Sequence, residues 1–472
     1  MASAARDLPD DLEKAQVLWE LRLGTHQYTI PTVDRGRVYI GIDDAKMDRP
    51  GIKPTGGGLL LCVEQTTGKM IWQMHSPRYM EGMTEPYHFD QWRAGFCSGP
   101  AVEGDRVFVV GNRGEVLCLD REGQTNGNDG PFLDELGYMG IKDPQGAALL
   151  PTDGDITWVH NFVKDLDVIP HDVCGSTLLI HGDFVYACTS NGVNGHHNMV
   201  PRPDAPTLIV LDKKNGRLVA TDGEKIGRRM LHGHWSSPSC GEVDGKAIIF
   251  LGGGDGVLYA FEPPAGPGDG SGAQTLKRVW SHDCNPPGYR MRDGRPIPYA
   301  RDSDKSPDGP SEILGTPVSH EGRVYVTIGQ SPMHGVGKGL LSCLDAATGN
   351  EIWSSALVER SLATVAISDG LLYVPDYSGR LHCFDTKTGE RCWTHEMEAG
   401  TWASSAFVAD GKVYAGTEAG VLWVLKAGKE KKVLSRMSLD SMPATLTAAD
   451  GVLFLPTQRR LTAYASKPPA GS

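Results

Sequence analysis

The sequence contains no apolar run of about 18 residues, the length that a transmembrane helix needs, so we expect no transmembrane segment. It also has no excess of positive charge. Its 46 lysines and arginines are outnumbered by 58 aspartates and glutamates, which gives a net charge of −12. This balance argues against the basic surface that binding to nucleic acid requires. A small-molecule ligand or another protein is therefore the expected partner.

Two kinds of marker segment are also missing. The ten cysteines include no Cys-x-x-Cys pair, which excludes a zinc ribbon. The first residues, Met1–Arg6, lack the apolar core of a secretory signal peptide. The protein is therefore expected either to be cytoplasmic or to be an exported protein whose leader is not part of this sequence.

The sequence does contain an internal repeat, a signal that takes precedence over local patterns when a fold is predicted. Leu341–Trp353 is typical of an apolar strand, a turn at Asp345–Gly349 and a return strand that ends in Trp. The same unit recurs at Leu60–Trp72 and at Leu381–Trp393, and Leu208–Leu218 is a copy without the Trp.

A second hairpin precedes these units. In Val102–Val107 and Val408–Tyr414, a Glu-Gly or Asp-Gly turn joins two apolar strands, which is a strong hairpin signal. The two hairpins supply four antiparallel strands, A to D. Eight such units align on the glycines of the A–B turns, at positions 36, 104, 182, 245, 322, 370, 411 and 451. The sequence therefore predicts an all-β fold, an eight-bladed β-propeller of four-stranded antiparallel blades.

The two ends of the repeat region predict how the ring closes. Ala15–Arg22 has the pattern of a strand D with its Trp, but no strand C precedes it. The last copy, Thr445–Ala465, has strands A to C and no D. We expect the N-terminal strand to complete the last blade, which removes two free sheet edges. The predicted parts are an extension (1–14), one propeller (15–465) and a tail (466–472), in a monomer.

The repeat unit, which consists of an apolar pair, a small residue, Asp, Thr-Gly and Trp, resembles the quinoprotein-type (PQQ-repeat) propeller motif over residues 16–465. That superfamily includes the quinoprotein alcohol dehydrogenases and the propeller lipoprotein of outer-membrane protein assembly. Thr189–Val193 and Leu231–Pro238 are similar to segments of uncharacterised bacterial PQQ-repeat propellers. The resemblance implies an exported, periplasmic bacterial protein.

The chain departs from the quinoprotein dehydrogenases where their cofactor binds. Those enzymes hold PQQ between a Trp and the ring that two adjacent, bonded cysteines form, and this sequence has no Cys-Cys pair. Neither their Ca²⁺ ligands nor their catalytic Asp has a matching position, and a Cys-x-x-Cys-His haem motif is missing. The sequence thus argues against PQQ and leaves a divalent metal, Ca²⁺ or a transition metal, as the open cofactor prediction.

The long loops predict which face carries a site. In a four-stranded blade the D→A and B→C connections share one face, and most long connections here are of these kinds. Eight histidines fall on this long-loop face: His26, His88, His171, His196, His197, His232, His234 and His334. A ligand or active site is therefore expected at the mouth of the central channel on this face.

The shared register refines this prediction. The position eleven residues before each A–B glycine should start the innermost strand, and it and the next position are rich in charged residues and histidines. Tryptophans outside the repeat position also lie at these entrances. The predicted ligand-binding residues are Trp92, Arg93, Trp235, Glu312, Glu359, Arg360 and Trp402. A water-filled channel rim without a ligand accounts for the same pattern.

Three histidines form the sharpest prediction. His232 and His234 are two apart, so on an extended segment both rings point the same way, and His171 is at the equivalent register of the adjacent blade. The three imidazoles are predicted to face one cavity as metal ligands. In the alternative, His171 or His234 acts as a general base with Asp172 as the orienting carboxylate.

Two further patterns each have two interpretations. Asn126–Gly130 in the long C–D connection of blade 2 is either a Ca²⁺-ligating loop or simple turn chemistry. Cys383 and Cys392 are predicted to be directly opposed across strands C and D. They form either a cross-strand disulfide in an oxidising compartment or a pair of free thiols, because the strand-C cysteine is a repeat feature that packs as a small apolar residue.

Two functions therefore remain open. One is an enzyme, an oxidoreductase or a sugar-active propeller, with its site at the channel mouth. The other is a non-catalytic scaffold or binding propeller that resembles the outer-membrane assembly lipoprotein. A closed polar pocket favours the first, and an exposed apolar groove or patch favours the second.

Overall fold

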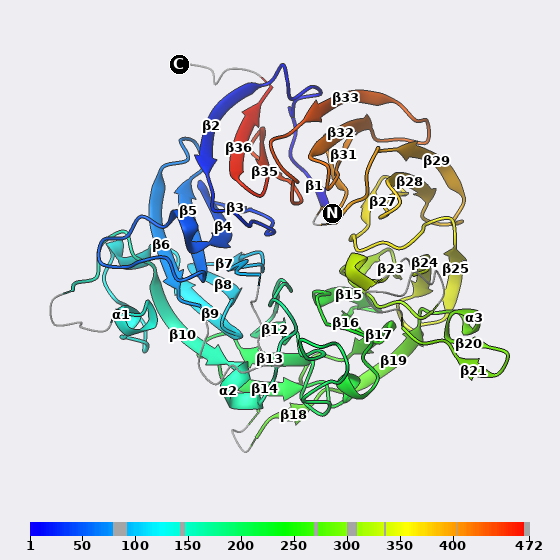
Figure 1. Ribbon diagram of the computed structural model, residues 1–472, viewed down its shortest axis with the longest axis horizontal. Helices are drawn as coiled ribbons and strands as arrows, with labels where there is room; N and C mark the ends of the chain where they lie inside the picture. Colours follow the sequence, from blue (N-terminus) through cyan, green and yellow to red (C-terminus); the bar gives the residue numbers. More distant parts are fainter. Residues whose placement is uncertain are drawn as a thin grey trace.

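Eight small antiparallel sheets surround a central axis in the computed structural model (Figure 1). The structure describes residues 1–78, 92–141, 147–268, 272–299, 309–334, 337–402 and 404–466. The sheets confirm the predicted eight-bladed β-propeller.

The first four blades use residues 32 to 283. Their strands, from the axis outward, are β3 (Thr32–Asp34), β4 (Arg37–Asp43), β5 (Gly58–Glu64) and β6 (Met70–Ser76); β7 (Ala101–Glu103), β8 (Arg106–Gly111), β9 (Glu115–Asp120) and β10 (Asp155–Asn161); β11 (Leu179–His181), β12 (Phe184–Cys188), β13 (Leu208–Asp212) and β14 (Leu218–Thr221); β15 (Ser239–Val243), β16 (Lys246–Gly252), β17 (Val257–Phe261) and β19 (Arg278–Asp283).

The last four blades follow the same order. Their strands are β22 (Val318–His320), β23 (Arg323–Ile328), β24 (Leu340–Asp345) and β25 (Glu351–Ser355); β26 (Ala366–Ser368), β27 (Leu371–Pro375), β28 (Arg380–Asp385) and β29 (Arg391–Glu396); β30 (Phe407–Ala409), β31 (Lys412–Gly416), β32 (Val421–Lys426) and β33 (Val433–Ser438); β34 (Thr447–Ala449), β35 (Val452–Pro456), β36 (Arg460–Ala465) and β2 (Gln16–Arg22).

A few short elements lie outside this pattern. Two extra strands pair in parallel with blade strands: β1 (Ala2–Ser3) with β30, and β18 (Gln274–Thr275) with β14. The loops hold a hairpin of β20 (Met291–Arg292) and β21 (Arg295–Pro296), and the helices α1 (Glu135–Tyr138), α2 (Phe162–Leu166) and α3 (Pro287–Arg290). None of the helices among the described residues is long and apolar enough to cross a membrane.

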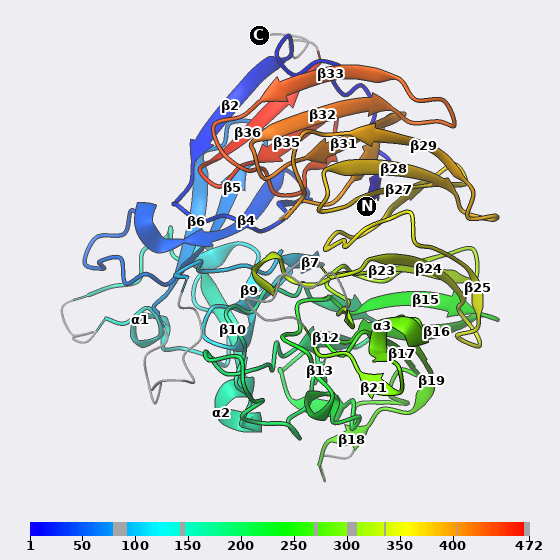
Figure 2. The same cartoon turned by 45° about the vertical axis from the view of Figure 1, so that its right-hand side comes forward.

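The two ends of the chain meet in blade 8. Strand β2 pairs antiparallel with β36 from Gln16↔Ala465 to Arg22↔Arg460. Figures 1 and 2 both show β2, in blue, beside β36, in red. The segment before β2 is packed as well, because the side chains of Leu8 and Leu12 are buried in the cluster formed by blades 7 and 8.

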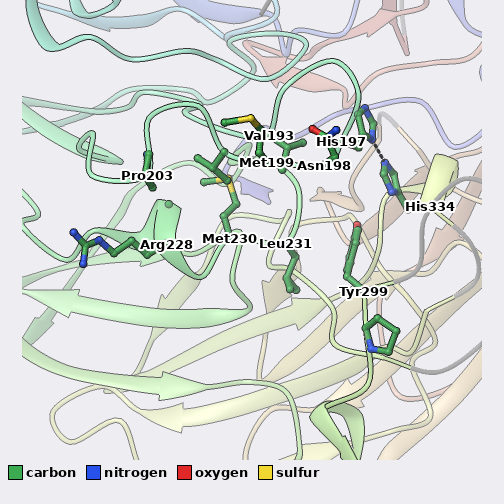
Figure 3. A pocket seen from close by; sticks show the side chains of 13 residues that line it. Val193, His197, Asn198, Met199, Pro203, Arg228, Met230, Leu231, Tyr299 and His334 are labelled. Carbon is green, nitrogen blue, oxygen red and sulfur yellow. Dashed lines mark hydrogen bonds between the residues drawn. The ribbon is translucent and has the colours of Figure 1, made fainter. Parts of the chain in front are cut away.

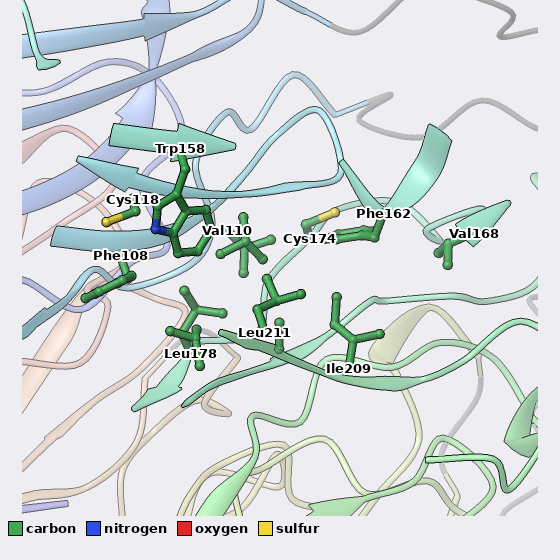
Figure 4. Close-up of a cluster of buried hydrophobic side chains, with 13 residues drawn as sticks. Phe108, Val110, Cys118, Trp158, Phe162, Val168, Cys174, Leu178, Ile209 and Leu211 are labelled. Atoms are coloured by element: carbon green, nitrogen blue, oxygen red, sulfur yellow. The ribbon is translucent and has the colours of Figure 1, made fainter. Parts of the chain in front are cut away.

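Six of the eight blades are coupled to the next through a repeat Trp, whereas the outer strands of blades 3 and 7 contain none. The indole Nε1 of Trp280 donates a hydrogen bond of 3.0 Å to the carbonyl of Ala346 in the C–D turn of blade 5. A Cβ on Gly349 of that turn would lie 2.5 Å from the Trp280 ring, so only glycine lets the ring approach. Figure 4 shows the corresponding layer between blades 2 and 3, where Trp158 packs with Phe108. The Thr-Gly and Trp of the repeat are therefore two halves of one inter-blade contact.

The register between strands C and D shifts at one place in every blade. In blade 6 this bulge sets Trp393 opposite Cys383, so the predicted direct pairing of Cys383 with Cys392 is wrong. Both cysteines are free thiols in the structure. The small strand-C residue is explained by its partner, because it faces the large ring of the repeat Trp.

Candidate metal centre

Four histidines from three blades meet on the long-loop face. His171 lies between α2 and β11, and His197 lies on the loop between β12 and β13. His232 precedes β15, and His334 ends a short 3-10 turn after β23. The ring centroids of His171 and His232 are 4.4 Å apart, and those of His232 and His334 are 4.0 Å apart. Loops that are far apart in the sequence thus converge on one cluster of imidazoles.

The hydrogen bonds of His171 determine which of its nitrogens faces the cluster. Its Nδ1 lies 2.8 Å from the carbonyl oxygen of Val193, and a carbonyl can only accept, so this nitrogen carries the hydrogen. The Nε2 of the neutral ring therefore holds a lone pair, and it lies 2.9 Å from Nε2 of His232. On the far side of His232, Nδ1 lies 3.7 Å from Oε1 of Glu312.

His197 completes a group with the spacing of a metal site. One ring nitrogen each from His171, His197 and His232 lie within 4.8 Å of one another. Nδ1 of His197 is also 2.9 Å from Nε2 of His334, and the two rings are stacked at 4.7 Å. His171 and His232 are buried, whereas His197 is only half-buried and lies toward the solvent side.

Burial holds the imidazoles of His171 and His232 in the neutral form. Desolvation, and then the neighbouring imidazoles, lower the pKa of His171 to about 4 and the pKa of His232 well below its usual 6.5. Glu312 is also buried, and desolvation raises its pKa to about 7 although Tyr299 donates a hydrogen bond of 3.0 Å to it. Neutral imidazole is the form that binds metal ions.

Several buried polar atoms around the cluster have no hydrogen-bond partner among the described residues. They are His232 Nδ1, Glu312 Oε2 and Trp235 Nε1. The Trp235 ring lies 5.0 Å from that of His232 and 5.9 Å from that of His171. Such atoms are costly unless a ligand or water satisfies them, so their concentration here is typical of a binding site.

A pocket of about 660 Å³ opens beside the cluster. Figure 3 shows His197 and His334 at one end of the pocket, with Tyr299 next to His334. The rest of the pocket is lined mainly by apolar and thioether side chains, including Met199, Met230 and Leu231, together with Asn198 and Arg228. The volume suits a small organic molecule, with polar groups at one end and an apolar wall for its body.

The structure brings together only part of the predicted histidine trio. His171 and His232 meet, but His234 points elsewhere: its Nδ1 accepts a 2.9 Å hydrogen bond from the N–H of Gly254, and its Nε2 is 3.4 Å from Thr207 Oγ1. The prediction for His234 required an extended segment, and residues 231–234 form no strand, because β15 begins only at Ser239. The expected trio is thus replaced by His171, His197 and His232.

The register prediction for the inner strands also needs correction. Strand β11 begins at Leu179 rather than at His171, because residues 171–178 form a bend and an irregular segment before the chain enters the sheet. Three predicted residues nevertheless lie at the cluster: Trp235, Glu312 and Asp172, whose Oδ2 is 3.4 Å from His171 Nε2. Asp172 faces the His171 nitrogen that holds the lone pair, whereas the Nδ1–H that an orienting carboxylate would accept is bound by the Val193 carbonyl, so this geometry does not favour the base-and-carboxylate alternative.

The remaining predicted ligand residues do not line this pocket. Trp92 and Trp402 are 51% and 39% exposed. Glu359 forms an ion pair of 3.1 Å with Arg380, and Arg360 stacks on the Tyr377 ring at 4.3 Å. The last predicted ligand residue, Arg93, is exposed and packs beside Gly56. His88, one of the eight histidines on the long-loop face, lies outside the described residues.

Sequence reasoning did not single out His197, His334 or Tyr299. Both histidines were among the eight on the long-loop face, but their loops lack the repeat register, so nothing in the sequence set them beside His171. Tyr299 lies in a long insertion without a repeat motif. The signal that could have found the pair was their position in the two long B–C loops of blades 3 and 5.

The comparisons with known proteins concern the fold. The family model of outer membrane protein assembly factor BamB matches residues 56–126 and 254–436, more than half of the chain. No curated protein matches the chain. The crystal structure of BamB from Moraxella catarrhalis superposes with a TM-score of 0.58 at 14% identity, over 96% of this chain and 99% of that one.

The structures of two dehydrogenases superpose on this chain about as well as that of BamB does. A europium-containing methanol dehydrogenase matches with a TM-score of 0.59 at 13% identity, over 98% of this chain and 96% of that one. The quinohemoprotein alcohol dehydrogenase ADHIIG from Pseudomonas putida HK5 matches with a TM-score of 0.56 at 11% identity, over 100% of this chain and 80% of that one. Identities this low establish the fold alone. With the family match they show that the chain belongs to the PQQ-repeat β-propeller family whose model is described as outer membrane protein assembly factor BamB.

Proposed function

We propose that this propeller is a transition-metal protein that binds and activates a small molecule in the pocket beside His197 and His334. The single observation that carries the proposal is the pair of Nε2 atoms of His171 and His232, which face each other at 2.9 Å. The proposed ligands are His171, His197 and His232, and the pocket is the proposed substrate site.

The environment of His232 favours a metal over a simple imidazole–imidazole hydrogen bond. Such a bond would place the His232 hydrogen on Nε2 and leave a lone pair on Nδ1 facing Glu312 Oε1 at 3.7 Å. With the hydrogen on Nδ1 instead, that N–H faces the Glu312 carboxylate, and the Nε2 lone pairs of both histidines converge. At 3.7 Å the N–H and the carboxylate are too far apart for a hydrogen bond, so metal binding would have to draw them together into the carboxylate–histidine arrangement of metal sites. Two nitrogens of a tetrahedral zinc site lie about 3.3 Å apart, so little movement is needed.

A metal site with three imidazole ligands and one side open to solvent suits a catalytic role better than a structural one. Structural zinc sites have four protein ligands, whereas catalytic sites keep one position for water or substrate. His197, the half-buried ligand, and His334 both line the pocket, so this position would face it. A metal held there would act as a Lewis acid, and Tyr299 and His334 lie where they can contact a bound molecule. The proposed reaction class is metal-assisted hydrolysis.

PQQ does not fit this chain. All ten cysteines are free, and no two are adjacent, so the ring of bonded cysteines that holds PQQ in the dehydrogenases cannot form. Trp235 is packed against His171 and His232 rather than free to stack on a flat cofactor. Among the described residues that line the pocket, Arg228 is the one Lys or Arg side chain, and it is engaged by Asp204.

A scaffold role is the second candidate, and the extent of the family match favours it for part of the molecule. The BamB model matches residues 56–126 and 254–436, whereas His171, His197 and His232 all lie between these stretches. A protein-binding role would therefore belong to the matched blades. The histidine cluster would be an addition specific to this chain.

Cobalt spectroscopy tests the metal site. Protein stripped with a chelator is titrated with Co²⁺, whose visible absorption reports coordination by nitrogen ligands. We expect one Co²⁺ per chain with tetrahedral bands, and loss of those bands in His171→Ala and His232→Ala. Circular dichroism and melting curves check that each variant is folded. Unchanged bands in the folded variants, or no bands in the parent, would refute the site.

A further inference from the structure

The C–D connection of blade 2 contains two buried carboxylates. It joins β9 to β10, and α1, which lies within it, is outside the ring (Figure 1). Glu135, the first residue of α1, and Asp155, the first residue of β10, are both fully buried. The segment Asn126–Gly130 folds over these two side chains through the hydrogen bonds described next.

Each carboxylate has one or two neutral donors. The N–H of Asp129 donates to Asp155 Oδ2 at 3.1 Å. Asn128 Nδ2 donates to Glu135 Oε2 at 2.8 Å, and the N–H of Ile156 is 3.3 Å from Glu135 Oε1. Among the described residues, no Lys, Arg or His forms an ion pair with Glu135 or Asp155. Two carboxyl groups are therefore buried together without a cation.

Two oxygen atoms at this place are unsatisfied. Asp155 Oδ1 and Asn128 Oδ1 are buried and have no hydrogen-bond partner among the described residues. Leaving a carboxylate oxygen buried and unpaired costs free energy, so the arrangement points to a missing partner. Burial, and then the charges of Glu135, Asp120 and Asp129, raise the pKa of Asp155 to about 6.

We propose that the C–D loop of blade 2 binds a Ca²⁺ ion through Asp155, Glu135 and Asn128. The donors are carboxylate and amide oxygens without any nitrogen or sulfur, and this set selects a hard cation. Ca²⁺ takes six to eight oxygens in flexible geometry, so backbone carbonyls and water complete the shell. The ion joins the start of α1 to the start of β10 and thereby stabilises the long connection. This site is separate from the proposed histidine site.

The test uses the full chain after treatment with a chelator. Ca²⁺ is expected to raise the melting temperature in a saturable way, whereas Mg²⁺, which demands near-ideal octahedral geometry, has a smaller effect. Tb³⁺ is expected to bind in place of Ca²⁺, with luminescence sensitised by Tyr138 of α1, and Ca²⁺ should displace it.

Variants locate the ion. Asp155→Asn and Glu135→Gln are expected to weaken Ca²⁺ binding by about tenfold or more, because the charge of the ligands sets the affinity. Asn128→Ala is the milder variant if either of these fails to fold. Glu262→Gln, in the C–D loop of blade 4, is the matched control and keeps the response. The proposal is overturned if millimolar Ca²⁺ leaves the parent unchanged, or if Asn128→Ala and Asp155→Asn respond as the parent does.

Discussion

Blades 5 to 7 and blades 2 to 4 share the same four-stranded sheet but differ in the length and content of the loops that connect their strands. Blades 5 to 7 are mostly joined by short connections, and the family match 254–436 spans them. Blades 2 to 4 carry the long C–D loop with α1 and the loops that bring His171 and His197 together. The repeat therefore determines the propeller fold, and the loops inserted between its strands hold the residues of the candidate sites.

The sheets and the long loops are held together differently. In both regions a Trp from one blade packs on a glycine of the next, as Trp353 does on Gly389 and Trp158 on Gly216. The long loops instead depend on buried polar groups, such as the Arg49–Asp153 ion pair at 2.8 Å. Apolar contacts between repeats tolerate sequence change in the loops, whereas polar networks depend on each partner.

The largest effect is expected from opening the ring. Deletion of residues 1–24 removes β2 and leaves β36 as a free edge, which should cause aggregation or a large loss of thermal stability. Size-exclusion chromatography and thermal melting measure the outcome. Deletion of residues 1–14 alone keeps β2 and serves as the control, with a smaller loss from Leu8 and Leu12. If the longer deletion behaves as the full chain does, β2 does not close the ring.

Two tryptophans, one buried in a blade and one exposed on a loop, should differ in how much they contribute to stability. Trp72 is fully buried and donates to the Arg121 carbonyl at 2.9 Å, so Trp72→Ala should cost about 3–5 kcal/mol of unfolding free energy. Trp92 is 51% exposed, so Trp92→Ala should change stability by at most about 0.5 kcal/mol. Urea denaturation provides both values. Equal losses in the two variants would contradict the distinction.

Two glycines with the same backbone conformation test the Trp–Gly contact. Gly349 and Gly370 have φ of +71° and +73°. A Cβ at Gly349 would lie 2.5 Å from the Trp280 ring, whereas at Gly370 the nearest atom, Thr386 Oγ1, is 4.0 Å away. Both alanine variants carry the left-handed backbone cost of about 1–2 kcal/mol. Gly349→Ala should lose a further 1–3 kcal/mol, roughly, from overpacking. Similar unfolding free energies for the two alanine variants would show that the contact with the Trp ring is not the reason for glycine at this position of the repeat.

A smaller, pH-dependent effect is expected from the long B–C loop of blade 1. Burial alone would raise the pKa of Asp44, but hydrogen bonds from His75 and Thr55 outweigh it and lower that pKa to about 2. The folded pKa lies below the unfolded value of 3.8, so the stabilisation is complete above about pH 4 and is lost as the pH falls toward 2.

Urea denaturation at pH 5 and at pH 3 measures this loss. Asp44→Asn should reduce the difference in unfolding free energy between the two pH values, and Asp105→Asn, at an exposed position, should not. A variant at Asp44 with the full pH dependence of the parent would show that other carboxyl groups carry it.

The fold was predictable from the sequence because each blade repeats the same local rules. The turn glycines and the Thr-Gly and Trp positions recur, so one misread copy does not change the count of eight. The bulge between strands C and D escaped prediction, because an extra residue leaves no mark in the sequence, and the pairing of Cys383 with Cys392 was therefore misassigned.

The site was predictable only in part, for a physical reason. The repeat register paired His171 with His234, and His232 was added because it is two residues from His234; of these three, His171 and His232 meet in the structure. His234 was misplaced because the rule of alternate side chains holds only on a strand, and residues 231–234 form none. His197 and His334 lie on B–C loops without a register, and only the three-dimensional path of these loops sets them beside His171.

A zinc titration followed by native mass spectrometry tests the central claim most directly. His196 and His197 are neighbours on one loop, but His196 is exposed and outside the cluster, so it provides a matched control. The proposed site predicts one Zn²⁺ per chain in the parent and in His196→Ala, and a large loss of affinity in His197→Ala with the fold retained. Equal zinc binding by the two variants, or none by the parent, would contradict it.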